Sequence, residues 1–304
     1  MVKESIQVRL FKRLMRIINF KKVFTYPEEK LLPLIIKGNK NMSFKIPNDN
    51  DFIYGDVVIM EKHHCLKMQK KKTPSERALM YLFGGGFIRG CDKSAVNHAK
   101  GLGERSGRDI WLPYYPLCTD YCITETYAMV YQTYKEMLKV YKPENIAIAG
   151  FSAGGALALG LGCHINALKE NVPMPGVILS SSPGSVPSSD EEVKKMRELN
   201  SLDVLLDEYF LTVTLKSVMT KGQTVPDYMI HTSFGDFSNF PKTHVCFATH
   251  ECLYAEADGI EKALQKYHVD YEIHAKEGMF HCYHNMTFCP EGKEGSAELD
   301  SYLK

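Results

Sequence analysis

A serine between glycines is the residue of this chain whose setting points most directly to chemistry. Ser152 lies in the stretch Gly-Phe-Ser-Ala-Gly-Gly at residues 150–155, after an apolar run at 146–149 and before a helix-like run at 156–159. A strand, a tight turn that exposes a serine and then a helix form a nucleophile elbow, where glycines let strand and helix approach closely. Because Gly-x-Ser-x-Gly also arises by chance, this interpretation depends on partners elsewhere in the chain.

The serine needs a base and a carboxylate, and the last part of the chain offers both. A serine hydroxyl becomes a nucleophile when a histidine takes its proton and a carboxylate fixes the tautomer of that histidine. Glu251 follows a predicted strand at 244–249, and His281 follows a predicted strand at 271–275. Side chains at the carboxyl ends of parallel strands meet at one edge of a sheet. We therefore predict a catalytic triad of Ser152, Glu251 and His281, in the order serine, acid, histidine.

Other residues compete for the roles of acid and base. Asp236 and Asp258 are alternative acids, although Asp236 lies in a loop before the strand and Asp258 within a predicted helix. The alternative bases are three nearby histidines, His250, His274 and His284. Cys252 and Cys282 flank the predicted acid and base, where packing and inhibition by oxidation are the two interpretations.

Strands and helices alternate along the chain and would position these residues. Apolar runs predict strands at 52–60, 77–83, 109–115, 146–149, 176–181, 244–249 and 271–275. Helical spacing predicts helices at 8–24, 95–105, 124–140, 255–267 and 295–302. The prolines of residues 27–50 predict loop with at most a short helix, and residues 190–219 form a charged helical stretch. The alternation predicts an α/β fold with a mostly parallel central sheet and helices on both faces.

Length and composition limit the classes of protein to which the chain can belong. Its 304 residues, of which 44% are hydrophobic and 24% charged, fit a single α/β domain. The net charge of +1 argues against a nucleic-acid partner. The nine cysteines lack paired or metal-ligand spacing, so we predict reduced thiols in a cytoplasmic protein and no metal site. We also expect no membrane span and no secretory signal.

The predicted helix at 8–24 is basic and amphipathic. Its aliphatic residues lie near one face, namely Leu10, Leu14, Ile17 and Ile18. Its cations lie on the other faces, namely Arg9, Lys12, Arg13 and Arg16. Three interpretations compete, namely an ordinary helix packed on the body, part of a lid over a pocket, and an anchor on a membrane surface. The shortness of the apolar face makes the anchor the least favoured of the three.

Four motifs in order resemble the hormone-sensitive-lipase-like carboxylesterases of the α/β-hydrolase fold. That family carries His-Gly-Gly-Gly-aromatic, Gly-Asp-Ser-Ala-Gly-Gly, Asp-x-Leu and Gly-Met-x-His-x-aromatic motifs. The corresponding stretches here are 83–87, 150–155, 251–253 and 278–283. Weaker matches are Tyr115-Pro116-Leu117 with Asp120, and Gly235-Asp236. The resemblance covers about residues 50–290.

The resemblance implies a serine carboxylesterase that forms an acyl-enzyme and hydrolyses short- to medium-chain acyl esters. It implies a small-molecule ester as partner, no metal and no organic cofactor, and it leaves a homodimer open. The backbone N–H groups that would form the oxyanion hole are those of Gly85, Gly86 and Ala153. The candidate residues for the substrate pocket are Phe87, Phe151 and Met279.

The resemblance also implies a helical lid, or cap, within a single domain spanning residues 1–304. Residues 1–45 and 184–225 would form this cap. Residues 46–183 and 226–304 would form the catalytic core. The lid interpretation of the basic N-terminal helix gains support from this division.

The chain departs from the family at several motif positions. Phe83 replaces the histidine that buttresses the glycine loop, and Phe151 replaces the acidic residue before the serine. Glu251 replaces the more common aspartate, and Pro116 replaces an arginine. Two other functions therefore remain open. One is hydrolysis of amides or N-formyl groups by the same triad, and the other is a ligand-binding member without turnover, for which Phe83 is the main support.

Overall fold

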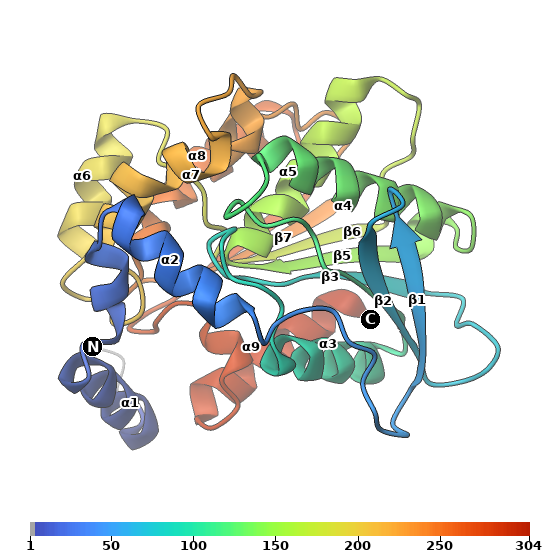
Figure 1. Ribbon diagram of the computed structural model, residues 1–304, viewed down its shortest axis with the longest axis horizontal. Helices are drawn as coiled ribbons and strands as arrows, with labels where there is room; N and C mark the ends of the chain where they lie inside the picture. Colours follow the sequence, from blue (N-terminus) through green and yellow to red (C-terminus); the bar gives the residue numbers. More distant parts are fainter. Residues whose placement is uncertain (1–3) are drawn as a thin grey trace.

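The computed structural model describes residues 4–304, which fold around one eight-stranded sheet (Figure 1). The strands are β1 (Ile53–Ile59), β2 (His63–Gln69), β3 (Ala78–Leu82), β4 (Asp109–Pro113), β5 (Ile146–Phe151), β6 (Val177–Ser181), β7 (Lys242–Ala248) and β8 (Tyr271–Lys276). Their order in the sheet is β1-β2-β4-β3-β5-β6-β7-β8. The pairs β1–β2 and β2–β4 are antiparallel, and all pairs from β4 to β8 are parallel. The predicted α/β fold with a mostly parallel sheet is confirmed.

Helices cover both faces of the sheet. They are α1 (Ile6–Ile17), α2 (Glu28–Asn39), α3 (Lys93–Ser106), α4 (Ile123–Leu138), α5 (Ala153–Leu168), α6 (Asp190–Leu199), α7 (Leu215–Thr220), α8 (Ala257–Lys266) and α9 (Pro290–Leu303). α3 and α9 lie together on one side, and α4 and α5 lie together on the other (Figure 1). Local sequence explains the ends of α3, because Asp92 caps its first turn and Gly107 ends it in a left-handed conformation.

Two segments near the N-terminus differ from the expected secondary structure. The predicted loop at 27–50 contains the helix α2, which continues through Pro33 because two glutamates favour its start and Leu31 packs into the core. The helix predicted at 8–24 ends at Ile17, and a short 3-10 helix, η1 (Phe20–Thr25), follows a left-handed Asn19.

The sheet also contains a strand that the apolar pattern did not indicate. β2 has two histidines, one lysine and one glutamine among its seven residues, and it forms because it pairs with β1 on one side and β4 on the other. The charged stretch at 190–219 is likewise broken rather than continuous. It divides into α6, an irregular segment with a π-helical turn at Phe210–Thr214, and α7.

The turn between β5 and α5 is as tight as an elbow requires. Ser152 has a φ of 56°, in the left-handed region that few residues adopt. A Cβ atom on Gly150 would lie 1.9 Å from the carbonyl oxygen of Gly154, and one on Gly154 would lie 2.1 Å from that of Leu82. Only glycine fits either position. The strained turn thus raises the serine at the carboxyl end of a central strand.

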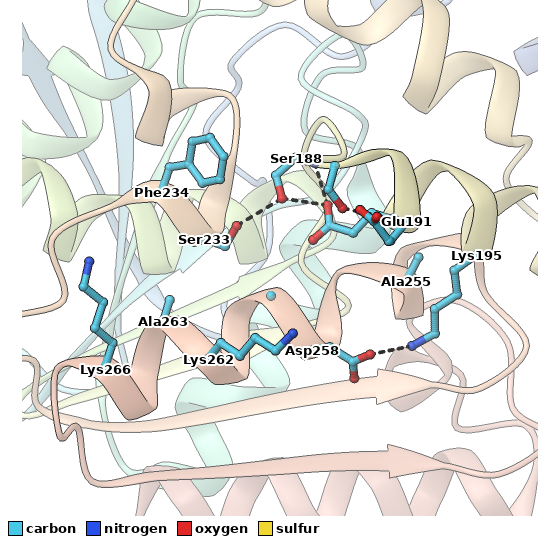
Figure 2. A pocket seen from close by; sticks show the side chains of 13 residues that line it. Ser188, Glu191, Lys195, Ser233, Phe234, Ala255, Asp258, Lys262, Ala263 and Lys266 are labelled. Carbon is cyan, nitrogen blue, oxygen red and sulfur yellow. Dashed lines mark hydrogen bonds and ion pairs between the residues drawn. The ribbon is translucent and has the colours of Figure 1, made fainter.

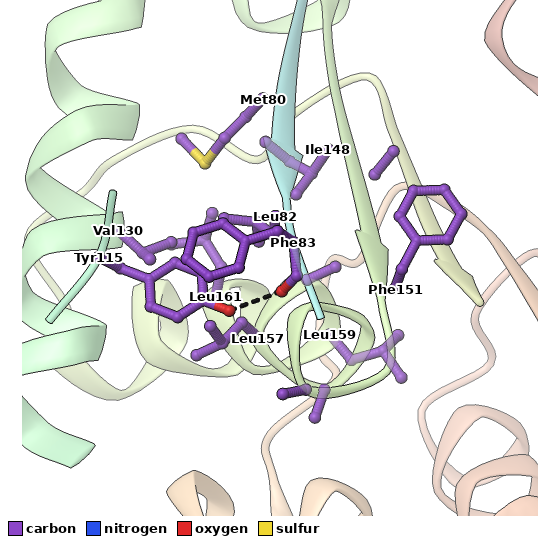
Figure 3. Packing of buried hydrophobic residues seen from close by; sticks show 14 of the residues in the cluster. Met80, Leu82, Phe83, Tyr115, Val130, Ile148, Phe151, Leu157, Leu159 and Leu161 are labelled. Carbon is purple, nitrogen blue, oxygen red and sulfur yellow. Dashed lines mark hydrogen bonds between the residues drawn. The ribbon is translucent and has the colours of Figure 1, made fainter. Parts of the chain in front are cut away.

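The core beneath this turn is largely apolar. α5 is buried over almost its whole length, from Ala153 to Ile165. Figure 3 shows Leu157, Leu159 and Leu161 of this helix beneath the end of β3, with the ring of Phe83 lying on that of Tyr115. The elbow therefore stands on a closely packed base, which limits how far Ser152 can move.

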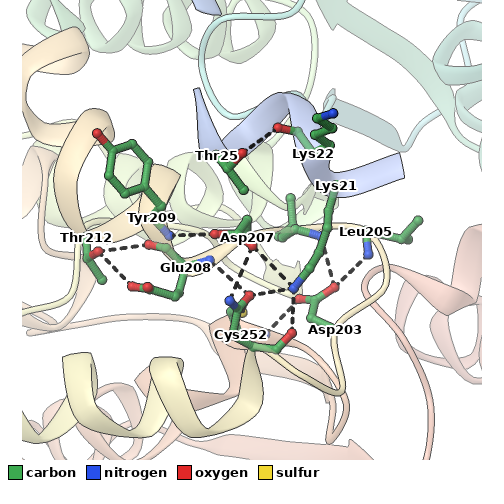
Figure 4. A network of polar contacts seen from close by, with 12 residues as sticks. Lys21, Lys22, Thr25, Asp203, Leu205, Asp207, Glu208, Tyr209, Thr212 and Cys252 are labelled. Atoms are coloured by element: carbon green, nitrogen blue, oxygen red, sulfur yellow. Dashed lines mark hydrogen bonds and ion pairs between the residues drawn. The ribbon is translucent and has the colours of Figure 1, made fainter. Parts of the chain in front are cut away.

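The two segments that the sequence predicts as a cap lie against each other. The Lys21 ammonium donates to the backbone carbonyl and side-chain oxygens of Asn200, at 2.6 and 2.7 Å, and pairs with Asp207 at 3.3 Å (Figure 4). The rings of Phe24 and Phe210 are in contact, with centroids 5.4 Å apart. The predicted segment 1–45 begins with residues 1–3, which lie outside the described residues.

Candidate active site

The structure brings Ser152, His281 and Glu251 into one hydrogen-bonded chain. The Oγ atom of Ser152 lies 2.9 Å from Nε2 of His281, and Nδ1 of that ring lies 2.6 Å from Oε2 of Glu251. Each residue follows a different strand of the parallel part of the sheet, β5, β8 and β7 respectively. This is the geometry in which a histidine can take a proton from the serine while the carboxylate fixes its tautomer.

Glu251 is fully buried and its second oxygen is also occupied. Oε1 accepts hydrogen bonds from the backbone N–H of Ala248 at 2.7 Å and from the hydroxyl of Ser182 at 3.0 Å. The same Ser182 hydroxyl accepts from the backbone N–H of Cys282, next to the histidine. The longer side chain of glutamate therefore reaches His281 in the position where the family more often has aspartate.

Electrostatics favours the charged form of His281. Burial would lower the pKa of this imidazole, but the contacts with Cys282 and with the carboxylate of Glu251 outweigh burial and raise the pKa well above its ordinary value. The Cys282 sulfur lies 3.6 Å from Nε2 of His281. A site that stabilises the imidazolium is suited to hold a proton taken from the serine.

The glycine loop lies directly against the elbow. A Cβ atom on Gly84 would lie 3.0 Å from Cβ of Ser152, and the next two glycines have φ values of 133° and 59°. Among the hydrogen bonds of residues 4–304, none is donated by the backbone N–H groups of Gly85, Gly86 or Ala153. Gly84 to Gly86 and Ala153 line the same cavity as Ser152 and His281.

An aromatic stack holds the start of this loop where the family has a histidine. The rings of Phe83 and Tyr115 are parallel, with centroids 4.1 Å apart and an angle of 5° (Figure 3). The Tyr115 hydroxyl donates to the carbonyl oxygen of Phe83 at 2.6 Å. Both side chains are buried. Packing and one buried hydrogen bond thus replace the polar support that the motif histidine would give.

A cavity of about 510 Å³ opens at the triad. Its walls include aliphatic and aromatic side chains of both predicted cap segments, among them Phe20, Val23, Phe24, Leu206, Phe210 and Leu211. Phe151 also lines it, in edge-to-face contact with His98, whose centroid is 4.8 Å away. Burial lowers the pKa of His98 to about 3, so this ring is neutral.

Two of the three predicted pocket residues lie elsewhere. Phe87, whose backbone has a left-handed φ of 62°, is buried in the main core and does not line the cavity. Met279 is buried in a smaller cluster with Val8 of α1, and it too is absent from the cavity wall. Their places are taken by side chains of the predicted cap, which the motifs did not reveal.

The competing acids and bases have other partners. Asp258 is paired with Lys195 at 3.1 Å on the surface, and Asp236 accepts from the backbone N–H of Ser238. His284 is buried 3.1 Å from the Ser181 hydroxyl, and burial lowers its pKa to about 3. The two remaining histidines contact charged groups, His250 at Lys12 and His274 at Glu272.

A polar network ties the acid loop to the predicted cap (Figure 4). The buried carboxylate of Asp203 accepts from the backbone N–H of Cys252, the residue after Glu251, at 2.8 Å. Asn200 donates to Asp207, and both contact Lys21 of η1. The position of the Glu251 carboxylate is thereby linked to two segments that are far apart in the sequence.

A second cavity, of about 380 Å³, lies between α6 and α8 (Figure 2). It is lined by serines, charged side chains and Phe234, and Lys195 bonds Asp258 across it. None of the triad residues contributes to its wall. Over residues 4–304, no group of three histidine, cysteine or acidic side chains is arranged to hold a metal ion.

Other properties of the chain bear on its partners. All nine cysteines are buried and free. Within the part of the chain that the structure describes, no helix is both long and apolar enough to cross a membrane.

Sequence reasoning missed Ser182, Tyr115 and Asp203 as supports of the site. Ser182 directly follows β6 with a left-handed φ of 48°, so its place at the carboxyl end of a parallel strand was a usable signal. Tyr115 lies two residues beyond β4 and belongs to a recognised motif. Asp203 lies within the irregular part of the predicted cap, where no sequence pattern indicated a contact with the acid loop.

The chain is similar to known hydrolases over most of its length. The model of a family described as having the alpha/beta hydrolase fold matches residues 79–285. An esterase of Acinetobacter venetianus is 25% identical over 238 residues, which cover 77% of this chain and 76% of that protein. An acetyl-hydrolase of Streptomyces hygroscopicus is 24% identical over 260 residues, or 82% of each chain.

Solved structures resemble the whole chain. An esterase/lipase from an uncultured bacterium superposes with a TM-score of 0.82 at 17% identity and covers 98% of both chains. An esterase from the bacterial hormone-sensitive lipase family superposes with a TM-score of 0.80 at 17% identity, over 99% of this chain and 98% of that one. At this level of identity the likeness establishes the fold.

Proposed function

This chain belongs to the α/β-hydrolase fold family, and on that basis we propose that it is a serine carboxylesterase acting on short- to medium-chain acyl esters. The observation that carries the proposal is the unbroken chain of hydrogen bonds from Ser152 through His281 to Glu251. The relatives named esterase and acetyl-hydrolase support the same reaction class, and they support the resemblance to hormone-sensitive-lipase-like enzymes.

In the first half-reaction, Ser152 is acylated. Its Oγ attacks the ester carbonyl carbon while Nε2 of His281 takes the hydroxyl proton, and Glu251 stabilises the imidazolium. The carbonyl oxygen becomes negative in the tetrahedral intermediate. When this collapses, His281 gives its proton to the departing alkoxide, so that an alcohol leaves and an acyl-enzyme remains.

In the second half-reaction, water replaces the alcohol. His281 takes a proton from the water as it attacks the acyl carbonyl, and then returns that proton to Ser152 as the bond to Oγ breaks. The carboxylic acid is released and the enzyme is restored. One ester and one water thus give one acid and one alcohol, without a metal or an organic cofactor.

The negative oxygen would be held by the N–H groups of Gly85, Gly86 and Ala153. Their place in the wall of the cavity beside Ser152, and the lack of another acceptor for them among residues 4–304, support this role. The start of α5 at Ala153 adds the positive end of a helix dipole. One donor of this kind is typically worth about 10²–10³ in rate.

The cap that we propose comprises residues 1–45 and 184–225. Within the described residues, η1, α2 and the segment around Phe210 contribute apolar walls to the cavity. Apolar walls of this kind bind acyl and alcohol chains by removing them from water. The free, buried thiols support the proposed cytoplasmic location, since reducing compartments keep cysteines unpaired.

The function is tested with a panel of p-nitrophenyl esters and a matched anilide. We expect acetate and butyrate esters to be hydrolysed, long-chain esters to be poor substrates because the cavity is small, and p-nitrobutyranilide to react far more slowly than the butyrate ester. Faster turnover of the anilide would favour the amide-hydrolase alternative. Binding without turnover of any ester or amide would contradict the proposal and favour a ligand-binding protein.

The tyrosine that supports the glycine loop should affect turnover. Replacing Tyr115 by phenylalanine leaves the buried Phe83 carbonyl without its hydroxyl donor, which costs about 1–3 kcal/mol of stability. We expect kcat for p-nitrophenyl butyrate to fall about tenfold, because a small shift of the loop misplaces the oxyanion donors.

Tyr134→Phe is the matched control for this change. Tyr134 is also buried and donates to a backbone carbonyl, that of Pro173, but it lies on α4 and does not line the cavity. It should lose similar stability and keep its kcat. Equal kcat values for the two variants would show that Tyr115 is not a specific support of the loop.

The pH dependence of kcat/KM should report the state of His281. The imidazole acts as a base only when it is neutral, so activity should fall as the pH is lowered through its pKa. Because the contacts of this ring raise that pKa, the midpoint of the acid limb should lie above the ordinary value of 6.5. The measurement is a profile of kcat/KM from mildly acidic to mildly alkaline buffers. A midpoint below the ordinary value would show that burial outweighs these contacts and would contradict the raised pKa of His281.

A further inference from the structure

The helix α1 has a second, aliphatic face turned to solvent. Its inner side is also largely apolar, since Val8 and Lys12 are buried and the half-buried Phe11 and Met15 pack beside them. The outer side carries a row of aliphatic residues that are 52–70% exposed: Ile6, Leu10, Leu14, Ile17 and Ile18. These residues recur at helical spacing and so share one face. We call them the α1 outer face.

Firm contacts hold the inner side of α1 to the body of the protein. The Lys12 ammonium donates to the Gly278 carbonyl oxygen and lies 3.1 Å from Nδ1 of His250. The rings of Phe11 and Phe280 are in contact, with centroids 4.6 Å apart. Gly278 and Phe280 belong to the loop that carries His281. The helix cannot roll to bury its outer face without breaking these contacts.

A row of cations runs beside the α1 outer face. Arg9, Arg13 and Arg16 are exposed and recur at the same helical spacing. None of them forms an ion pair with any residue in the range 4–304, and α1 contains no acidic residue. An exposed aliphatic row flanked by unpaired arginines is the composition of a helix that lies in a lipid headgroup layer.

The α1 outer face continues to the entrance of the active site. Phe20 follows Ile18 by two residues, is 44% exposed, and lines the cavity that contains Ser152. In Figure 1, α1 projects from one end of the molecule, next to the helices of the proposed cap. A flat surface that met α1 would therefore lie close to the mouth of this cavity.

We propose that the α1 outer face docks on the surface of a bilayer that contains anionic lipid. Its aliphatic side chains enter the boundary between headgroups and acyl chains, and its arginines contact lipid phosphate and carboxylate groups. Self-association through the same face is disfavoured, because it would bring six unpaired arginines together. The docking does not depend on the esterase reaction, so the two proposals can fail separately.

The test measures flotation of the full chain with vesicles. The Ser152→Ala form is used so that no lipid ester is hydrolysed, with vesicles of equal parts phosphatidylcholine and phosphatidylserine and with phosphatidylcholine alone. We expect binding to the anionic vesicles, and about tenfold weaker partitioning for Leu10→Ser/Leu14→Ser and for Arg9→Gln/Arg13→Gln. The matched control is Val58→Ser/Val140→Ser, which changes two exposed valines away from α1 and should bind as the parent does.

Several outcomes would overturn the proposal. One is failure of the parent to bind anionic vesicles, and another is binding by both α1 variants that is as strong as binding by the parent. A loss of vesicle binding in the valine control as large as that in the α1 variants would also contradict it. A dimer in sedimentation velocity that Leu10→Ser/Leu14→Ser converts to monomer, without vesicle binding, would assign the face to a second copy of the chain. The α1 substitutions are also made in the chain that keeps Ser152. These variants should hydrolyse p-nitrophenyl acetate at the parental rate, and this result would show that they are folded.

Discussion

Ser152→Ala is expected to lower kcat for p-nitrophenyl butyrate by about 10⁴–10⁶-fold. The loss is this large because the hydroxyl oxygen forms the acyl-enzyme, and within residues 4–304 no other serine is bonded to His281. Substrate binding should be nearly unchanged, since the cavity walls are retained. The measurement is steady-state release of p-nitrophenolate at saturating substrate, with binding of a non-hydrolysable ester analogue followed separately.

Ser180→Ala is the matched control for the loss of a buried hydroxyl near the elbow. The Ser180 hydroxyl bonds the carbonyl oxygen of Gly155 at 2.9 Å and does not touch His281. This variant should lose some stability but keep its kcat within about a factor of two or three, because it leaves the triad intact. If Ser152→Ala retained more activity than Ser180→Ala, the assignment of the nucleophile would be wrong.

The second large effect is expected for Glu251→Gln, which should lower kcat by about 10³–10⁴-fold. The amide could place an N–H donor opposite Nδ1 of His281, which then must be the unprotonated nitrogen. Nε2 would carry the proton and could no longer accept one from Ser152. Loss of the carboxylate should also lower the pKa of His281, so the remaining activity should have its acid limb at lower pH than the wild type.

Glu256→Gln is the control for this variant. Glu256 is also buried and close in sequence, but its carboxyl group contacts Ser185 rather than His281. Burial raises the pKa of Glu256 to about 8, so it is largely protonated at neutral pH, and the isosteric amide should change kcat little. Loss of activity in Asp236→Asn or Asp258→Asn with retention in Glu251→Gln would transfer the acid role to another residue.

The three hydrogen-bonded residues of the proposed triad could be brought together from the sequence because each of them follows a strand. A parallel sheet gathers the residues at its carboxyl edge, and Ser152, Glu251 and His281 each come within a few residues of a strand end. The order of the motifs along the chain then distinguished them from the alternative acids and histidines. Ser182 also directly follows a strand, β6, so its position at the same edge of the sheet could have been predicted, although it belongs to no motif.

Contacts that depend on tertiary packing could not be found in this way. The stack of Phe83 on Tyr115 joins two strand ends that are 32 residues apart, and it depends on the orientations of both rings. The helix α2 runs through Pro33 because its other residues pack against the body, which local propensity does not reveal. Phe87 was adjacent to the glycine loop in sequence, but in the structure it is buried in the main core.

The N-terminal helix shows what hydrophobic periodicity leaves undecided. The pattern identified an apolar face with Leu10 and Leu14, and the usual expectation is that such a face packs inward. In the structure the inner side is instead formed by Val8 and Lys12, with Phe11 and Met15 packed beside them. The Lys12 ammonium there donates to the Gly278 carbonyl oxygen. Hydrophobic periodicity shows which residues share a face of a helix, but it does not show which face packs against the rest of the protein.

The most direct test of the central claim is the site of covalent labelling by an organophosphate ester, such as diethyl p-nitrophenyl phosphate. We predict release of one p-nitrophenolate per chain, a diethylphosphoryl group on the peptide that contains Ser152, and no labelling of Ser152→Ala. Labelling should also be much slower in Glu251→Gln. A label on another residue, such as the neighbouring Cys282, or an unlabelled wild-type chain that still hydrolyses esters, would contradict a mechanism through Ser152.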